Sequence, residues 1–276
     1  MKERLRSSLR PVLYLLNRRL SDSQLESIRC LVETHSIVPD TATLASLPRN
    51  STFPPETAFP LLLPQLLPES VERVLFLDPD LLVLDDIGTI WEMDLAGNFV
   101  GAVADQAIPF ASSPRGVNAR RESDIPDDAP YFNAGVLLID LEKWRSNDIA
   151  GQARRYLERN NVDFFHQEAL NAVLWDKWLK LDERWNLIAS LTSRSYSAND
   201  ARAIENPGIV HFAGKFKPWR IRVGGPFASA YYDELANLGE SSPQVNGVEA
   251  LLSIYDRYLR DFLYPTEHLL WKRRLI

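Results

Sequence analysis

Residues 74–84, Val-Leu-Phe-Leu-Asp-Pro-Asp-Leu-Leu-Val-Leu, decide the fold class. The four apolar residues 74–77 predict a fully buried strand, and a second short strand is expected at 81–84. Asp78 and Asp80 follow the first strand, at the end where open α/β sheets bind ligands. Alternate residues of an extended segment face the same side, so both carboxylates can reach one divalent cation. The pattern also fits a surface turn, and that alternative stays open.

On both sides of this stretch, short apolar runs that predict strands alternate with segments whose apolar residues recur at helical spacing. Strands are predicted at 11–16, 100–104, 136–139 and 209–212, and two of them are followed by Asp105 and Asp140. Helical periodicity is expected at 25–32, after a Ser-x-x-Gln capping box at 21–24, and at 149–157, 169–174 and 248–262. This order predicts an α/β fold, with helices on both faces of a mixed, mostly parallel sheet.

The connecting segments and the domain limits follow from turn-forming residues. Residues 39–68 are rich in proline, which predicts short helical turns in a surface connection. From the length of the chain, residues 1–240 are predicted to form one domain, and residues 241–276 a helical extension with a basic, aromatic tail.

Composition excludes several classes of protein. The chain has 31 Lys and Arg against 37 Asp and Glu, a formal charge of -6, which argues against nucleic-acid binding. With 45% hydrophobic residues it is expected to fold around a substantial core rather than to be disordered. The single cysteine, Cys30, rules out an intrachain disulfide and favours a reducing compartment. No signal peptide or membrane span is visible, so the predicted location is the cytoplasm.

A second group of chemically capable residues lies far along the chain. His211 is in an apolar strand, where a satisfied core histidine is the usual alternative. Gly214 and Lys217 follow it, and a glycine backbone and a lysine charge suit a pyrophosphate. Two carboxylate oxygens and an imidazole nitrogen suit Mn²⁺ better than Mg²⁺, although Mg²⁺ is not excluded.

Two amide side chains are further candidates. Asn133 is predicted at the start of a strand beside a ligand crevice, with a plain turn asparagine as the rival interpretation. Gln167 precedes a helix, where it would either cap the helix or meet a polar ligand.

Five segments together resemble family 8 glycosyltransferases, which include glycogenin and the bacterial lipopolysaccharide galactosyl- and glucosyltransferases. They are FLDPD at 76–80, FNAGVL at 132–137, HQEALN at 166–171, RWN at 184–186 and HFAGKFKPW at 211–219. They occur in the family's order and spacing. The resemblance implies the type A glycosyltransferase fold and a Mn²⁺-dependent transfer of a hexose from a UDP-sugar, with retention of the anomeric configuration.

Roles follow from this resemblance for matching positions. It implies that Asp78, Asp80 and His211 hold the metal, and that Gly214 and Lys217 contact the diphosphate. It also implies that Asn133, Gln167 and Asp105 lie near the transferred sugar.

The chain departs from the family pattern in three places. The predicted strand at 11–16 resembles the second strand of the family pattern, and the first strand and helix of that pattern are expected to be missing. Pro60 stands where an arginine near the nucleotide is expected, and His166 replaces an aspartate that binds sugar hydroxyls. These departures leave a second hypothesis open, a weakly active or inactive sugar-binding module or partner subunit. A third is a haloacid-dehalogenase-like phosphatase, which shares an Asp-x-Asp motif but expects Gly-Thr after it.

The expected partners are a nucleotide-sugar donor and a glycan or lipid-linked acceptor. Residues 265–276 mix apolar and basic side chains, which predicts either peripheral contact with an anionic inner-membrane face or a helix packed on the domain.

Overall fold

The computed structural model describes residues 9–18, 20–47, 55–160, 162, 165–189, 203–214, 217–220 and 227–239. The chain divides into two compact units, residues 1–187 with 196–210, and residues 188–195 with 211–276. The domain boundary at residue 240 stays a proposal. The predicted helix at 248–262 and the basic tail lie outside the described residues.

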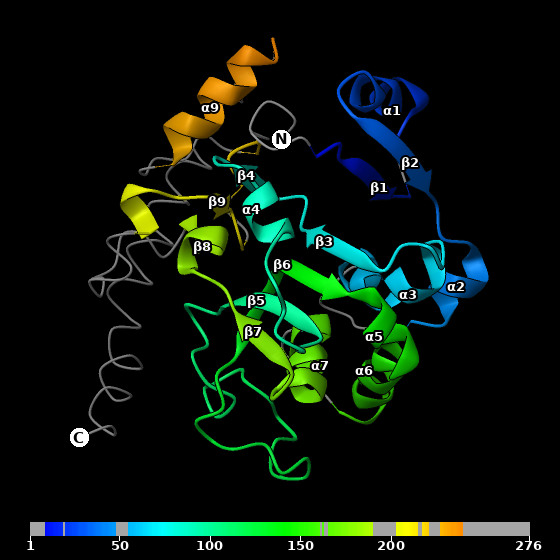
Figure 1. Cartoon of the computed structure of the whole chain (residues 1–276), viewed down its shortest axis with the longest axis vertical. Helices are drawn as coiled ribbons and strands as arrows, with labels where there is room; N and C mark the ends of the chain where they lie inside the picture. Colours follow the sequence, from blue (N-terminus) through cyan, green and yellow to red (C-terminus); the bar gives the residue numbers. More distant parts are fainter. Residues whose placement is uncertain are drawn as a thin grey trace. The chain divides into compact units, whose positions relative to one another are not determined.

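A four-stranded sheet in the order β3-β6-β5-β7 lies in the first unit (Figure 1). Its strands are β3 Arg73–Leu77, β5 Val100–Ala104, β6 Phe132–Asp140 and β7 Trp178–Lys180. β6 pairs antiparallel with β3 and with β5, and only β5 and β7 pair in parallel. The predicted mixed α/β fold is confirmed, but mostly parallel pairing is wrong for this sheet because β6 runs against both of its neighbours.

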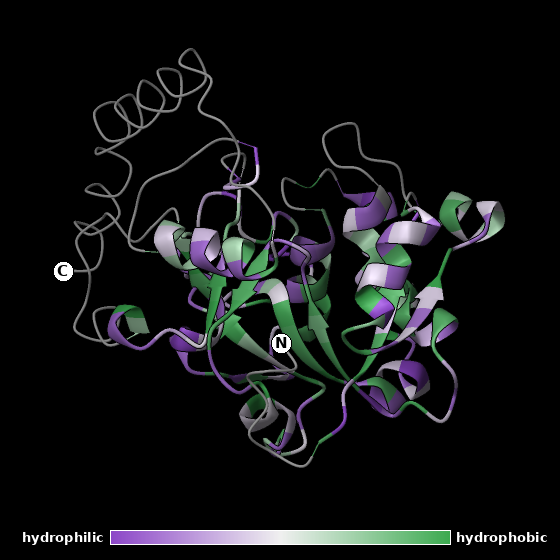
Figure 2. Cartoon of the chain, turned by 90° about the horizontal axis from the view of Figure 1, so that it is seen from above, coloured by the Kyte–Doolittle hydropathy of each residue, from purple (hydrophilic) through white to green (hydrophobic). Residues whose placement is uncertain are grey.

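β6 is buried on both faces, and its side chains alternate between two apolar clusters. Leu137 and Ile139 pack into one cluster, and Val136 and Leu138 into the other. This two-residue alternation is the geometry of a pleated strand. Figure 2 shows the central strands of the protein in green, the colour of hydrophobic residues. By contrast β3 is only partly buried along its length, so the prediction of a fully buried strand at 74–77 is wrong.

Helices supply the rest of both clusters. The first cluster contains residues of 3-10 helix η2 Pro55–Leu62 and of helices α5 Leu141–Ser146, α6 Ile149–Arg159 and α7 Phe165–Leu174. The second contains residues of α4 Gly88–Trp91 and of 3-10 helix η3 Glu183–Asn186.

The prediction of a surface connection over residues 39–68 is wrong. The expected short helical turns are present as α2 Thr41–Ala45, η2 and α3 Leu63–Leu66. Several of their side chains are core residues, namely Ala58, Phe59, Leu61, Leu62, Leu63 and Leu67. The apolar content of this stretch outweighs its prolines, because a 3-10 helix accommodates Pro60 while its neighbours turn inward.

The N-terminal elements form a separate two-stranded parallel sheet of β1 Val12–Leu16 and β2 Glu33–Ile37. Between them, α1 Asp22–Arg29 begins with the predicted capping box, since the Ser21 and Gln24 side chains bond reciprocally to the backbone. The prediction that this helix continues to residue 32 is wrong. The helix stops at Arg29, none of its residues is buried, and Leu31 is 54% exposed.

A three-stranded sheet has the order β4-β9-β8, with β4 Leu81–Val83, β9 Ile209–His211 and β8 Leu187–Ile188. The backbone N–H of Leu84 donates to Gly208 O at 2.8 Å, which ties the chain after β4 to the start of β9. A Cβ on Gly208 would lie 2.5 Å from the Trp185 ring, so this approach requires glycine.

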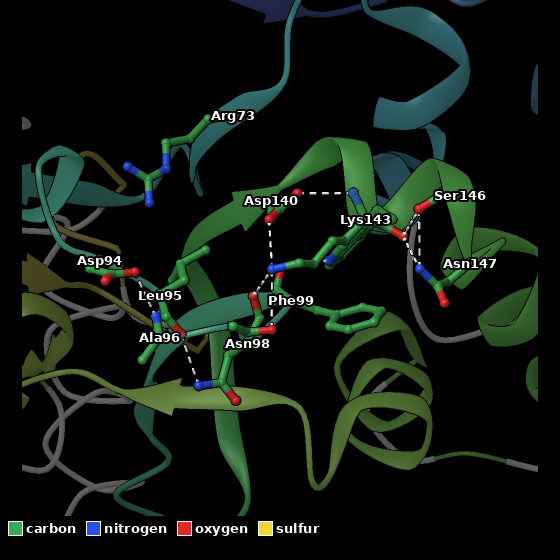
Figure 3. A network of polar contacts seen from close by, with 12 residues as sticks. Arg73, Asp94, Leu95, Ala96, Asn98, Phe99, Asp140, Lys143, Ser146 and Asn147 are labelled. Carbon is green, nitrogen blue, oxygen red and sulfur yellow. Dashed lines mark hydrogen bonds and ion pairs between the residues drawn. The ribbon is translucent and has the colours of Figure 1, made fainter.

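Asp140, one of the two strand-end aspartates, has a structural task. Its Oδ1 accepts the backbone N–H of Lys143 and caps α5, while its Oδ2 lies 3.0 Å from Lys143 Nζ. Figure 3 shows the same ammonium reaching the carbonyl oxygen of Asn98, and it also donates to the carbonyl oxygen of Gly97. Asp140 therefore joins β6 to α5.

Candidate active site

The three predicted metal ligands lie at the ends of three strands, β3, β4 and β9. Asp78 directly follows β3, and its backbone N–H donates to Gly135 O at 2.9 Å. Asp80 directly precedes β4, and His211 is the last residue of β9, which lies beside β4. His211 is 4% exposed.

The donor atoms of these residues meet the requirements of a divalent metal. One ligand atom each from Asp78, Asp80 and His211 lies within 4.8 Å of the others. Ligands on opposite sides of a cation with bonds of about 2.1–2.4 Å are separated by about 4.2–4.8 Å, so the spacing fits. Two carboxylate oxygens with one imidazole suit Mn²⁺, and the residues present fit the metal that was predicted.

A second group of polar side chains is centred on Asp105, which directly follows β5 and is 5% exposed. Its Oδ1 accepts the backbone N–H groups of Ala107 and Ile108 at 2.8 and 2.9 Å. Its Oδ2 accepts Asn133 Nδ2 at 2.9 Å and Gln167 Nε2 at 3.1 Å. The structure thus brings together the three residues predicted beside the sugar.

In both amide side chains, the oxygen as well as the nitrogen makes a hydrogen bond within the protein. Gln167 Oε1 accepts the backbone N–H of Ala134 at 3.0 Å, and Asn133 Oδ1 accepts the N–H of Gly135 at 2.9 Å. Asn133 lies inside β6 rather than in a turn, and Gln167 lies in the first turn of α7 rather than before it. Neither residue is a plain turn or cap residue, so both rival interpretations are wrong.

Gly135 connects the two groups of side chains. Its N–H donates to Asn133, and its carbonyl accepts the N–H of Asp78. A single residue of β6 therefore sets the spacing between the acidic pair and the amide group.

Asn186 is a site residue to which the sequence assigned no role. Its Nδ2 donates to Asn133 Oδ1 at 2.8 Å, and the residue is 1% exposed in η3. The available signal was its place in the Arg-Trp-Asn segment at 184–186.

Tyr131 and Glu168 are two buried polar residues close to Asn133 and Gln167 in the sequence. Both are fully buried, and burial raises the pKa of the Tyr131 phenol well above its ordinary value, with the carboxylates of Asp105 and Glu168 adding to the effect. Glu168 Oε1 accepts the Asn118 backbone N–H and the Tyr156 hydroxyl, each at 2.8 Å. Glu168 thereby anchors the loop that follows β5.

The two predicted diphosphate ligands lie after β9, in the second unit. Gly214 has φ +90°, a backbone conformation that side-chain-bearing residues rarely adopt. Lys217 Nζ donates to the carbonyl of Phe212 at 2.7 Å. Its Nζ also lies 5.6 Å from the centre of the Trp219 ring.

His166 stands on α7 next to Gln167, and burial of its imidazole lowers its pKa to about 4. The residue as a whole is partly buried. At neutral pH this position carries an uncharged ring in place of the family's aspartate.

The pH dependence of stability tests this environment. The folded protein keeps His166 neutral down to about pH 4, whereas the unfolded chain protonates it below about pH 6.5, so the free energy of unfolding falls as the pH falls between these values. Between about pH 7 and pH 5 this loss amounts to up to about 2 kcal/mol. Urea unfolding at both pH values is expected to show a smaller decrease for His166→Gln than for the wild type. Equal decreases would contradict a desolvated imidazole.

The fold and the site together define a mixed α/β protein in which two aspartates and a histidine at strand ends could hold a metal ion. The sequence matches Glycosyl transferase family 8 over residues 6–222, so the chain belongs to this family, as predicted. This membership leaves no support for the phosphatase hypothesis.

The chain is also similar to individual proteins over part of its length. The chain is 35% identical over 178 residues to General stress protein A of Bacillus subtilis, covering 59% of this chain and 58% of that protein. It is 26% identical over 225 residues to Lipopolysaccharide 1,2-glucosyltransferase of Escherichia coli, covering 79% and 65%. The chain thus spans less than two thirds of the length of these relatives.

A solved structure confirms the type A glycosyltransferase fold. The galactosyltransferase LgtC, in complex with donor and acceptor sugar analogues, superimposes with a TM-score of 0.68 at 23% identity, covering 87% of this chain and 88% of that chain. Within the described residues, no helix is both long and apolar enough to cross a membrane.

Proposed function

We propose that this glycosyltransferase moves a hexose from a UDP-sugar to a glycan or lipid-linked acceptor, with Mn²⁺ and with retention of configuration. The observation that carries the proposal is the convergence of Asp78, Asp80 and His211 within 4.8 Å, next to the amide and carboxylate group around Asp105. A metal-held diphosphate beside a polar sugar pocket is the arrangement that this transfer needs.

The metal cluster would act on the leaving group. Asp78, Asp80 and His211 would hold the cation, which when bound offsets the negative charge that develops on the diphosphate as the glycosidic bond breaks. Lys217 would add a positive charge to the same diphosphate. No proton donor to the leaving group is then required.

The amide group would hold the sugar. Asp105 accepts a hydrogen bond from each of Asn133 and Gln167, so its carboxylate fixes the position of both amides. An amide such as Gln167 is a poor nucleophile, which favours front-face substitution over a covalent intermediate. In that route Gln167 would stabilise positive charge at the anomeric carbon through its carbonyl dipole.

A sugar-binding or partner subunit with little turnover is the second candidate. The uncharged His166 and the buried Pro60 stand where the family pattern expects an aspartate and an arginine. Both changes would weaken donor binding while leaving the metal cluster intact.

A donor screen separates these two functions. We expect Mn²⁺-dependent release of UDP from one of UDP-glucose, UDP-galactose and their N-acetyl forms, and its loss in Asp80→Ala. Titration calorimetry with UDP and Mn²⁺ provides the second readout. UDP binding without turnover of any donor, with candidate acceptors present, would support the subunit hypothesis. Folded protein without either property would contradict the proposed function.

A further inference from the structure

The segment from Phe212 to Trp219, here called the diphosphate loop, begins and ends with an aromatic residue. It contains Gly214 and Lys217, and it directly follows His211. Lys217 Nζ bonds to Phe212 O at 2.7 Å and lies 5.6 Å from the centre of the Trp219 ring. The lysine therefore bridges the two ends of its own loop.

Tyr231 contacts both of these ends from outside the loop. It lies on α9 Ala228–Asn237, a helix that the sequence analysis did not predict. Its ring centre is 5.7 Å from that of Phe212, edge to face at 74°, and 6.2 Å from that of Trp219 at 44°. Both separations lie in the range of favourable aromatic pairs.

We propose that Tyr231 is a positioning residue that clamps the diphosphate loop by packing on Phe212 and Trp219. The inference rests on the proposed function, which assigns the diphosphate to Gly214 and Lys217. It goes beyond the family pattern, because Tyr231 lies past residue 222, where the family match ends.

The physical reason is preorganisation. A segment that contacts a ligand loses backbone freedom on binding, and this loss weakens binding unless the segment is already held. The Tyr231 ring, packed on Phe212 and Trp219, restrains these two residues without touching the ligand itself. Phe212 is also the neighbour of the metal ligand His211.

The ring, rather than the hydroxyl, makes these contacts. Burial raises the pKa of Tyr231, and the neighbouring Tyr232 adds to the shift, so the phenol stays neutral at physiological pH. Tyr231→Phe keeps the ring and is expected to behave as the wild type. Tyr231→Ala removes the clamp.

The first measurement is amide hydrogen exchange of residues 212–220 in the ligand-free protein, which does not depend on activity. In Tyr231→Ala this segment is expected to exchange about tenfold faster, with little change in the central sheet. Tyr231→Phe is expected to match the wild type. Asp233→Ala is the matched control, since Asp233 lies on the same helix with an exposed side chain.

The second measurement is the affinity for UDP with Mn²⁺ and the steady-state kinetics of donor use. In Tyr231→Ala we expect about tenfold weaker UDP binding and a raised donor KM, with a smaller change in kcat, because the clamp acts on ground state and transition state alike. Tyr231→Phe should restore the wild-type values.

The outcomes separate the two proposals. Wild-type protein that binds no UDP would contradict the proposed function, while hydrogen exchange would still decide whether Tyr231 clamps the loop. Unchanged exchange and unchanged UDP affinity in Tyr231→Ala would overturn the clamp. Equal effects of Tyr231→Ala and Asp233→Ala would also overturn it, because they would indicate a general loosening of α9.

Discussion

Asp80→Asn is expected to lower Mn²⁺-dependent UDP release by a factor of about 100 or more. Asparagine has nearly the same shape as aspartate, but it removes one of two negative charges in a cluster whose ligand atoms lie within 4.8 Å. The remaining carboxylate and imidazole would hold the cation less tightly, so less charge is offset on the diphosphate. Release of UDP measured over a range of Mn²⁺ concentrations gives both the rate and the apparent metal affinity.

Asp94→Asn is the control for this change. Asp94 is exposed and accepts the backbone N–H of Ala96, away from the cluster, so its replacement is expected to leave UDP release unchanged. If Asp80→Asn kept wild-type rates at every Mn²⁺ concentration, the three residues would not form the working metal site.

Arg145→Ala is expected to lower the free energy of unfolding by about 2–4 kcal/mol. The guanidinium of Arg145, on α5, donates to five carbonyl oxygens between residues 64 and 71, at 2.9–3.2 Å. These carbonyls include that of Leu67, which ends α3, so one side chain ties the buried segment before β3 to the helix after β6. Urea unfolding measures the loss.

Two further variants test whether the hydrogen bonds of the planar Arg145 guanidinium cause this loss of stability. Arg145→Lys keeps the charge but not the planar set of donors, so an intermediate loss is expected. Arg155→Ala removes an arginine on neighbouring α6 that is half exposed and paired with Asp148 at 3.1 Å. A surface pair of this kind contributes about 1 kcal/mol or less. Equal losses for Arg145→Ala and Arg155→Ala would contradict the role of the carbonyl bonds.

Local patterns predicted much of the fold. The apolar run at 74–77 with its two following aspartates, the strand at 100–104 and the capping box at 21–24 are present as expected. These features depend on neighbours within a few residues of each other, so the sequence contains their full cause. The co-linear segments added the family and, through it, the type A fold.

Other expectations failed because they depended on distant partners. The direction of β6 is set by hydrogen bonds to β3 and β5, which no local pattern of apolar residues reveals. The burial of residues 58–67 depends on helices α5 to α7, which lie far along the chain and offer an apolar surface.

In the candidate site, too, some features follow from the sequence and others only from the tertiary structure. From the sequence alone came the chemistry: two carboxylates, an imidazole, two amides and a loop with glycine and lysine, each a property of the residue type. Only the tertiary structure decided that Asn186 bonds to Asn133, that Gly135 links the acidic pair to the amides, and that Tyr231 packs on both ends of the diphosphate loop. Sequence determines what a side chain is able to do, whereas its neighbours depend on how distant strands and helices pack.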